Sequence, residues 1–172
     1  MINWPEIYGA FDGNMPECEG AACPKKCYKP RKTMTTWQGE KTYFTSLLDE
    51  SELDFQNKFN PSLRKLGIQV EAIDVEADVG TDLTFLVSGC LDSKHGCKLQ
   101  SHRPLACRMY PFRATNNSNP IDQINCPRSR EIAANREIIK KILHVRKIFG
   151  FNDSNGAWLK SIRNFRADYG LL

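Results

Sequence analysis

The chain has 172 residues, of which 41% are hydrophobic and 10% aromatic, as is ordinary for a globular protein with a sizeable core. Its 24 basic and 20 acidic residues are interspersed and leave a net charge of +4, which argues against nucleic acid as the main partner. No apolar run is long enough to span a membrane, and the first residues, MINWPEIYGAFDG, lack the pattern of a signal peptide. We therefore expect a cytoplasmic protein without a membrane partner.

Cysteine is the most informative residue type in this composition. In the reducing cytoplasm, seven thiols are better explained as metal ligands or redox groups than as a disulfide framework. The odd number also does not allow complete disulfide pairing within one chain.

Residues 1–40 look loop-rich, because four prolines and several glycines interrupt any regular periodicity. This segment holds the first three cysteines, Cys18, Cys23 and Cys27. A segment of this kind does not build its own core, and a metal cross-link is a natural way to hold it.

Residues 41–112 alternate between helical and β-rich stretches and predict an α+β core that carries the cysteine-rich motif. Strands are expected where β-branched and aromatic residues gather, in 41–45, 68–75 and 83–88, with a hairpin connection at 78–82. Ser51 is expected to cap a short helix, and Pro61 to start a second one that ends at Gly67.

The C-terminal part, 126–172, reads as helical. One helix is expected from Pro127 to a stop at Gly150, and a last helix from about Asp153 to a stop at Gly170. The predicted fold is therefore a single α+β domain over 1–172, with a short antiparallel sheet, C-terminal helices and cysteine-rich loops tied by metal.

The spacing of the cysteines supports a metal site without selecting the metal. Cys18-x4-Cys23-x3-Cys27 and Cys90-x6-Cys97-x9-Cys107 each bring three thiols together, and thiolate is the preferred protein ligand of zinc and of iron–sulfur clusters. Neither spacing matches a C-x2-C zinc knuckle or a ferredoxin C-x2-C-x2-C run. Glycine precedes two of the cysteines, at Gly89 and Gly96, and there it permits a positive φ or a close approach of the backbone.

Cys126 lies directly before Pro127 and a predicted helix. The positive end of the helix dipole would favour the deprotonated, metal-binding form of its thiol. The alternative is that Cys126 serves as a small buried hydrophobic residue.

The stretch Cys97–Phe112, CKLQSHRPLACRMYPF, resembles the signature of the YkgJ-type cysteine-cluster proteins, a family described as zinc- or iron-chelating. The matching positions are Cys97, Leu99, Arg103, Pro104, Cys107, Arg108, Tyr110, Pro111 and Phe112. Cys90 and the pair Cys126-Pro127 match further family positions. Spacing and resemblance together predict the metal ligands Cys18, Cys23, Cys27, Cys90, Cys97, Cys107 and Cys126. Arg103 and Arg108 are candidates to offset the negative charge of several thiolates.

Two departures from the family pattern leave the ligand set open. The upstream cysteines lack the adjacent pair that is usual in the family, and Gln100 replaces an aromatic residue. His95 and His102 are candidates for a missing ligand, although a single histidine is more often a surface residue.

Three functions follow as alternatives. Zinc would make the chain a metal-binding protein whose loops are cross-linked by the metal. Iron or a [4Fe–4S] cluster would instead suit a redox or protein-modification enzyme. The third is an accessory subunit that docks on a protein partner through its basic C-terminal helices. The sequence has no phosphate-binding loop, no G-x-S-x-G and no H-E-x-x-H, so whether it is an enzyme, and its oligomeric state, stay open.

Overall fold

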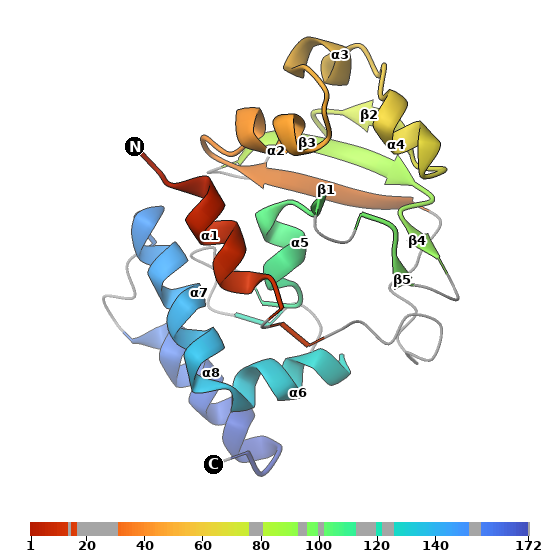
Figure 1. Cartoon of the computed structure of the whole chain (residues 1–172). Helices are drawn as coiled ribbons and strands as arrows, with labels where there is room; N and C mark the ends of the chain where they lie inside the picture. The colour runs from red at the N-terminus through yellow and green to blue at the C-terminus, as the bar shows by residue number, and fades with distance from the viewer. Residues whose placement is uncertain are drawn as a thin grey trace. The chain divides into compact units, whose positions relative to one another are not determined.

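A computed structural model describes residues 1–13, 15–16, 31–75, 81–92, 96–99, 102–112, 120–121, 126–151 and 156–171. These residues form helices together with a small antiparallel sheet, which confirms the predicted α+β class (Figure 1). The chain divides into two compact units, the first made of Met1–Trp4 and Cys18–Cys107, the second of Pro5–Glu17 and Arg108–Leu172. None of the helices in the described part of the chain has the length and hydropathy needed to cross a lipid bilayer.

The first unit is built on a three-stranded sheet in the order β1-β3-β2, with both pairs antiparallel. Its strands are β1 (Arg31–Trp37), β2 (Gln69–Ile73) and β3 (Thr81–Ser88), and a second, two-stranded sheet pairs β4 (Leu91–Asp92) with β5 (Gly96–Cys97). The strands predicted in 68–75 and 83–88 are thus confirmed. Of the hairpin connection predicted at 78–82, Thr81 and Asp82 instead belong to β3, and residues 78–80 lie outside the described residues.

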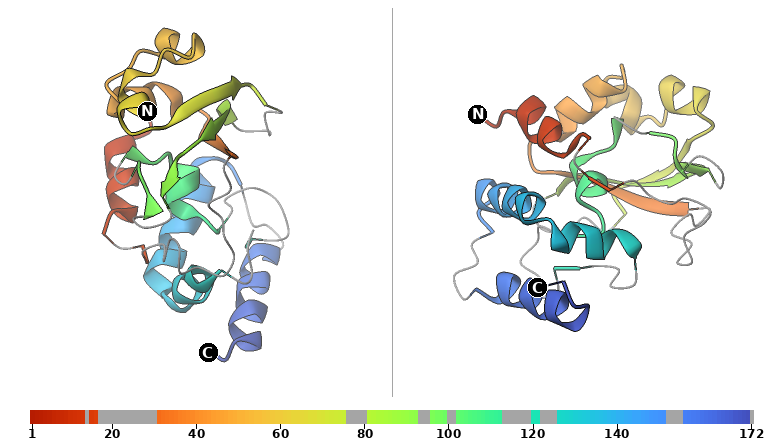
Figure 2. Two further views of the ribbon diagram at one scale, coloured as in Figure 1. Left: turned by 90° about the vertical axis from the view of Figure 1, so that its right-hand side faces the viewer. Right: turned by 60° about the horizontal axis from the view of Figure 1, so that its bottom comes forward.

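One face of the three-stranded sheet carries the core of this unit. Met34 on β1 lies opposite Phe85 on β3, so both side chains point to the same face. The short helices α2 (Lys41–Leu47), α3 (Glu52–Gln56) and α4 (Pro61–Lys65) cover this face, as Figures 1 and 2 show. Phe55 of α3 packs edge-on against Phe85, with ring centroids 5.0 Å apart.

The segment 41–45, predicted as a strand, is instead the first part of α2. Phe44 and Leu48 are one helical turn apart and both are buried in the core of the first unit. The hydroxyl of Thr45 donates to the carbonyl of Lys41, so it is satisfied inside the helix. Packing against the sheet therefore outweighs the β propensity of the sequence KTYFT.

The prediction that residues 1–40 are loop-rich is wrong for two stretches. Residues 31–37 form β1, and α1 spans Trp4–Phe11. In α1, Trp4, Ile7, Tyr8 and Phe11 are all buried and follow the i, i+3, i+4, i+7 spacing of a helix. Residues 17–30, which hold the first three cysteines, lie outside the described residues.

In the second unit, the helix predicted from Pro127 to Gly150 is two helices, α6 (Pro127–Ala134) and α7 (Arg136–Ile148). Asn135 separates them because its backbone is extended, with φ −86° and ψ 101°. Its side-chain oxygen accepts hydrogen bonds from the N–H groups of Glu137 and Ile138 and so caps α7.

The last helix, α8, spans Ala157–Asp168, and residues 152–155 before it are not described. Both predicted stops are confirmed, since Gly150 and Gly170 have φ of +72° and +63°. The apolar stripes of α7 and α8 are buried, as predicted for core residues, among them Ile138, Ile142, Val145, Trp158, Ile162 and Phe165.

Candidate metal centre

Cys90 and Cys97 lie on the small hairpin that continues from β3. Leu91 pairs with Cys97 across the hairpin, and the N–H of Lys98 donates to the carbonyl of Cys90 at 3.0 Å. Cys90 is buried and Cys97 is half-buried. The chain reaches this hairpin through Gly89, whose φ of +73° confirms the positive φ expected there. Gly96 lies in β5.

Cys107 joins these two cysteines from a different element. It lies on α5 (Leu105–Met109), a short helix that the sequence did not predict. Cys90 belongs to the hydrophobic cluster of the first unit, and Cys97 and Cys107 pack against the same cluster. None of these three cysteines is in a disulfide bond, and each is buried or half-buried. The fold thus gathers the cysteines of the family-like motif around one apolar cluster.

The first turn of α5 contacts a carboxylate that the sequence analysis missed. Glu40 is fully buried, and its Oε1 accepts a hydrogen bond from the N–H of Leu105 at 2.6 Å. Its Oε2 accepts from the N–H of Trp37, also at 2.6 Å. The local signal was Gly39-Glu40 directly after β1, at the start of α2, which was mistaken for a strand.

Cys126 lies in the second unit as the N-cap residue of α6, where its backbone is extended and its side chain is 5% exposed. Its predicted position at a helix N-terminus is confirmed. Its role as a metal ligand stays a prediction.

Two of the other candidates have clear surroundings. The side chain of His102 is exposed, as expected for a surface histidine. The guanidinium of Arg108 is 2% exposed, pairs with the carboxylate of Asp12 and stacks 4.2 Å from the ring centroid of Tyr8. Arg108 therefore has a packing role in the second unit beside the predicted one. Arg103 is half-buried.

Among the described residues, no three His, Cys, Asp or Glu side chains are close enough together to hold a metal ion. Cys18, Cys23, Cys27 and His95 lie outside the described residues. The structure therefore brings Cys90, Cys97 and Cys107 to one cluster and leaves the complete ligand set as a prediction.

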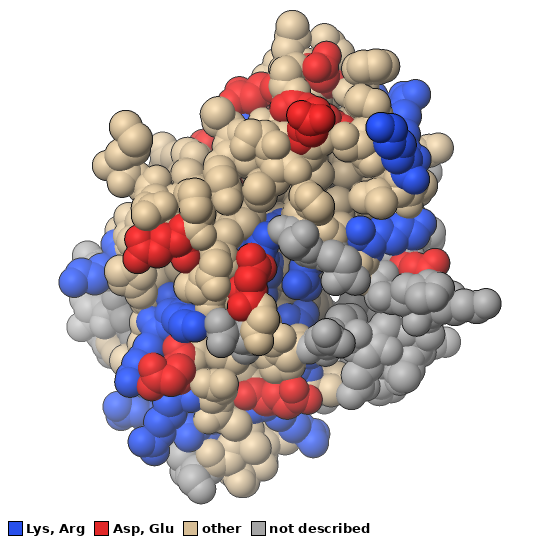
Figure 3. Space-filling view, in the orientation of Figure 1, with Lys and Arg blue, Asp and Glu red and all other residues tan. Residues whose placement is uncertain are grey.

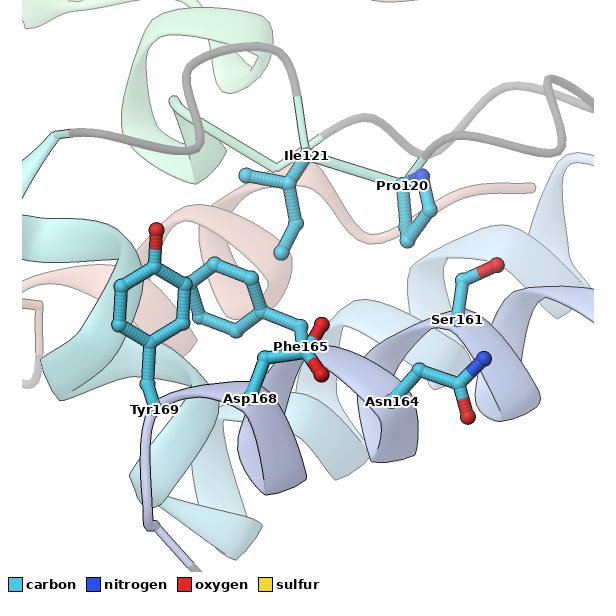
Figure 4. A pocket seen from close by; sticks show the side chains of 7 residues that line it. All are labelled: Pro120, Ile121, Ser161, Asn164, Phe165, Asp168 and Tyr169. Atoms are coloured by element: carbon cyan, nitrogen blue, oxygen red, sulfur yellow. The ribbon is translucent and has the colours of Figure 1, made fainter.

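A cleft of about 510 Å³ lies in the second unit, and none of the residues that line it is a predicted site residue (Figure 4). Its polar side chains all come from α8, and its other walls are apolar or aromatic: Ser161, Asn164, Asp168, Pro120, Ile121, Phe165 and Tyr169. Around α7 and α8, Lys and Arg side chains are interspersed with acidic ones on the face shown in Figure 3.

Comparison of the chain with protein-family models, curated proteins and solved structures finds no match. The resemblance of Cys97–Phe112 to the YkgJ-type signature therefore stays a prediction. The fold and the site define an α+β protein with three thiols around one apolar cluster.

Proposed function

We propose that this chain binds a metal, zinc or iron, through cysteine thiolates in a reducing compartment such as the cytoplasm. The observation that carries the proposal is the packing of Cys90, Cys97 and Cys107 against one hydrophobic cluster. Two of these thiols are on a hairpin and the third is on a helix, so a shared metal would bind two separate elements. Thiolates in such surroundings suit zinc and iron–sulfur centres better than magnesium or calcium, which prefer oxygen ligands.

Cys18, Cys23 and Cys27 are the further candidate ligands that the sequence offers, and they lie outside the described residues. Six thiols exceed the four ligands of one tetrahedral zinc site, so the proposal includes either one site with additional thiols or two adjacent sites. Zinc would make the centre structural, because the free energy of metal binding then stabilises the folded state.

The proposal is tested by thermal unfolding of the wild type and of Cys107→Ser, each with and without a chelator. We expect the chelator to lower the melting temperature of the wild type markedly and to have little further effect on Cys107→Ser. Leu99→Val is the control, since it removes a methylene group from the same cluster and leaves every thiol in place. We expect this control to have a lower melting temperature than the wild type, and we expect the chelator to lower it further. A wild type that melts identically with and without chelator would refute a structural metal.

The two alternative functions are separated by simple observations. An iron–sulfur centre for redox chemistry or protein modification would give the purified protein a visible colour, which zinc does not. Docking of the C-terminal helices on a protein partner predicts that a second protein co-purifies, and monomeric elution without one would count against it.

A further inference from the structure

We propose that Glu40 is the positioning residue for Cys107, because its carboxylate fixes the first turn of the helix that carries this thiol. The inference rests on the proposed metal site. It concerns a residue outside the cysteine motif and outside the resemblance of Cys97–Phe112.

The first N–H groups of a helix have no acceptor within the helix. In α5 the N–H of Leu105 is such a group, and Leu105 is fully buried, so bulk water does not reach it. Oε1 of Glu40 supplies the acceptor at 2.6 Å. Without it, a buried donor would be left unsatisfied at the start of α5.

The second carboxylate oxygen of Glu40 is hydrogen-bonded to the sheet. Oε2 accepts from the N–H of Trp37, the last residue of β1, so one carboxylate joins β1 to α5 across 65 residues of sequence. A buried carboxylate is tolerated only when hydrogen-bond donors surround it. Loss of either donor, the N–H of Trp37 or that of Leu105, would therefore be costly. Cys107 is in the same turn as Leu105, and its own N–H donates to the carbonyl of Pro104 at 2.9 Å. The location of the thiol therefore follows from the location of the carboxylate.

Glu40→Gln is the sharpest substitution at this site. Both oxygens of Glu40 accept from backbone N–H groups, whereas a glutamine amide has one acceptor and one donor end. Whichever way it is oriented, the amide NH2 faces a backbone N–H at Trp37 or Leu105. The variant is nearly identical in volume, so it keeps the size of the side chain while it loses at least one hydrogen bond and the negative charge.

The chain offers a matched control in Glu50. Oε1 of Glu50 accepts from the N–H of Ser62 at 3.1 Å, in the first turn of α4. Glu50→Gln is therefore the same chemical change at the first turn of another short helix in the same unit. Two differences separate the sites: Oε2 of Glu50 makes no hydrogen bond among the described residues, so a glutamine there can keep the bond from Ser62, and α4 carries no cysteine.

The experiment is a cobalt(II) titration of the full-length reduced protein without oxygen, read by thiolate-to-cobalt absorbance, on the wild type and both variants. Hydrogen exchange of the α5 amides in the metal-free proteins is measured beside it. We expect Glu40→Gln to weaken cobalt binding by about 10–100-fold and to speed exchange in α5. Glu50→Gln should leave both cobalt affinity and exchange in α5 unchanged.

The outcomes separate this inference from the proposed function. A wild type that gives no thiolate-to-cobalt absorbance overturns the proposed metal site, and the inference with it. A wild type that binds cobalt, with Glu40→Gln and Glu50→Gln equal in affinity, overturns the inference alone. If Glu40→Gln does not fold, Glu40→Asp is used instead, because it keeps the charge and is one methylene too short to bridge both donors.

Discussion

Gly89 lies so close to the carbonyl oxygen of Gly67 that a Cβ atom added at Gly89 would be 2.5 Å from that oxygen. Gly89 also has a φ of +73°, which side chains disfavour. It joins the end of β3 to Cys90, so this backbone contact sets where the cysteine hairpin begins.

We expect Gly89→Ala to lower the free energy of unfolding by more than about 2 kcal/mol, because left-handed strain of roughly 1–2 kcal/mol adds to the clash with Gly67. Gly150→Ala is the control: Gly150 has a φ of +72° and no atom within 4 Å of an added Cβ. The free energy of unfolding of that variant should fall only by the cost of the left-handed strain, about 1 kcal/mol. Urea unfolding measures both values, and equal losses would show that the contact at Gly89 is unimportant.

Arg108→Lys tests the packing role of the buried guanidinium. Lysine keeps the charge but loses the planar group that stacks on Tyr8 and pairs with Asp12, so we expect a loss of about 1–2 kcal/mol. In the control Arg130→Lys, the arginine is exposed although it stacks 4.3 Å from the ring centroid of Tyr169. We expect this control to lose less than about 1 kcal/mol in the same unfolding measurement. A larger loss for the control would contradict the account.

Ser51 caps α3, since its hydroxyl oxygen accepts a hydrogen bond from the N–H of Asp54 at 3.0 Å. Ser51→Ala should cost about 1 kcal/mol of unfolding free energy. Ser46→Ala removes a hydroxyl that only donates to the carbonyl of Tyr43 at the exposed surface, and it should be nearly neutral. Denaturant midpoints compare the two, and indistinguishable midpoints would argue against the cap.

Burial raises the pKa of Glu50 above its ordinary value of 4.5, and the charge of Asp54 adds to this, against the opposing hydrogen bonds from the Leu63 and Ser62 N–H groups. The folded state therefore holds the proton more tightly than the unfolded state. The resulting stability is fully present below pH 4.5 and is lost as the pH rises through the raised pKa. In Glu50→Gln this loss is absent, so the unfolding free energy of the variant should rise relative to that of the wild type as the pH increases above 4.5 and through the raised pKa. A difference that stays constant with pH in urea unfolding would contradict the raised pKa.

Local signals predicted much of the fold. Ser51 as a cap, Gly150 and Gly170 as stops, and the β-rich stretch of β3 are short-range features, and the structure bears them out. The helix at 41–47 was missed because burial of Phe44 in the core decides its conformation, and that burial is a tertiary effect.

The candidate site was likewise predicted only where the signal was local in the sequence. The sequence alone indicated Cys90, Cys97 and Cys107, because cysteine spacing is visible along the chain. The contact of Glu40 with Leu105 could not be predicted in this way, since these two residues are 65 positions apart. The helix α1 is a different case. The helical spacing of Trp4, Ile7 and Phe11 was present in the sequence, but the nearby prolines and glycines led to the prediction of a loop.

The central claim, a thiolate-bound metal, is tested most directly by the metal content and optical spectrum of protein purified without oxygen. We predict at least about one zinc or iron per chain, lost together with the thiolate ligands in the double variant Cys97→Ser/Cys107→Ser. Zinc without visible absorbance would define a structural centre, and iron with acid-labile sulfide and a brown colour a cluster. Protein that contains neither metal, and takes up neither when reconstituted under reducing conditions, would contradict the account.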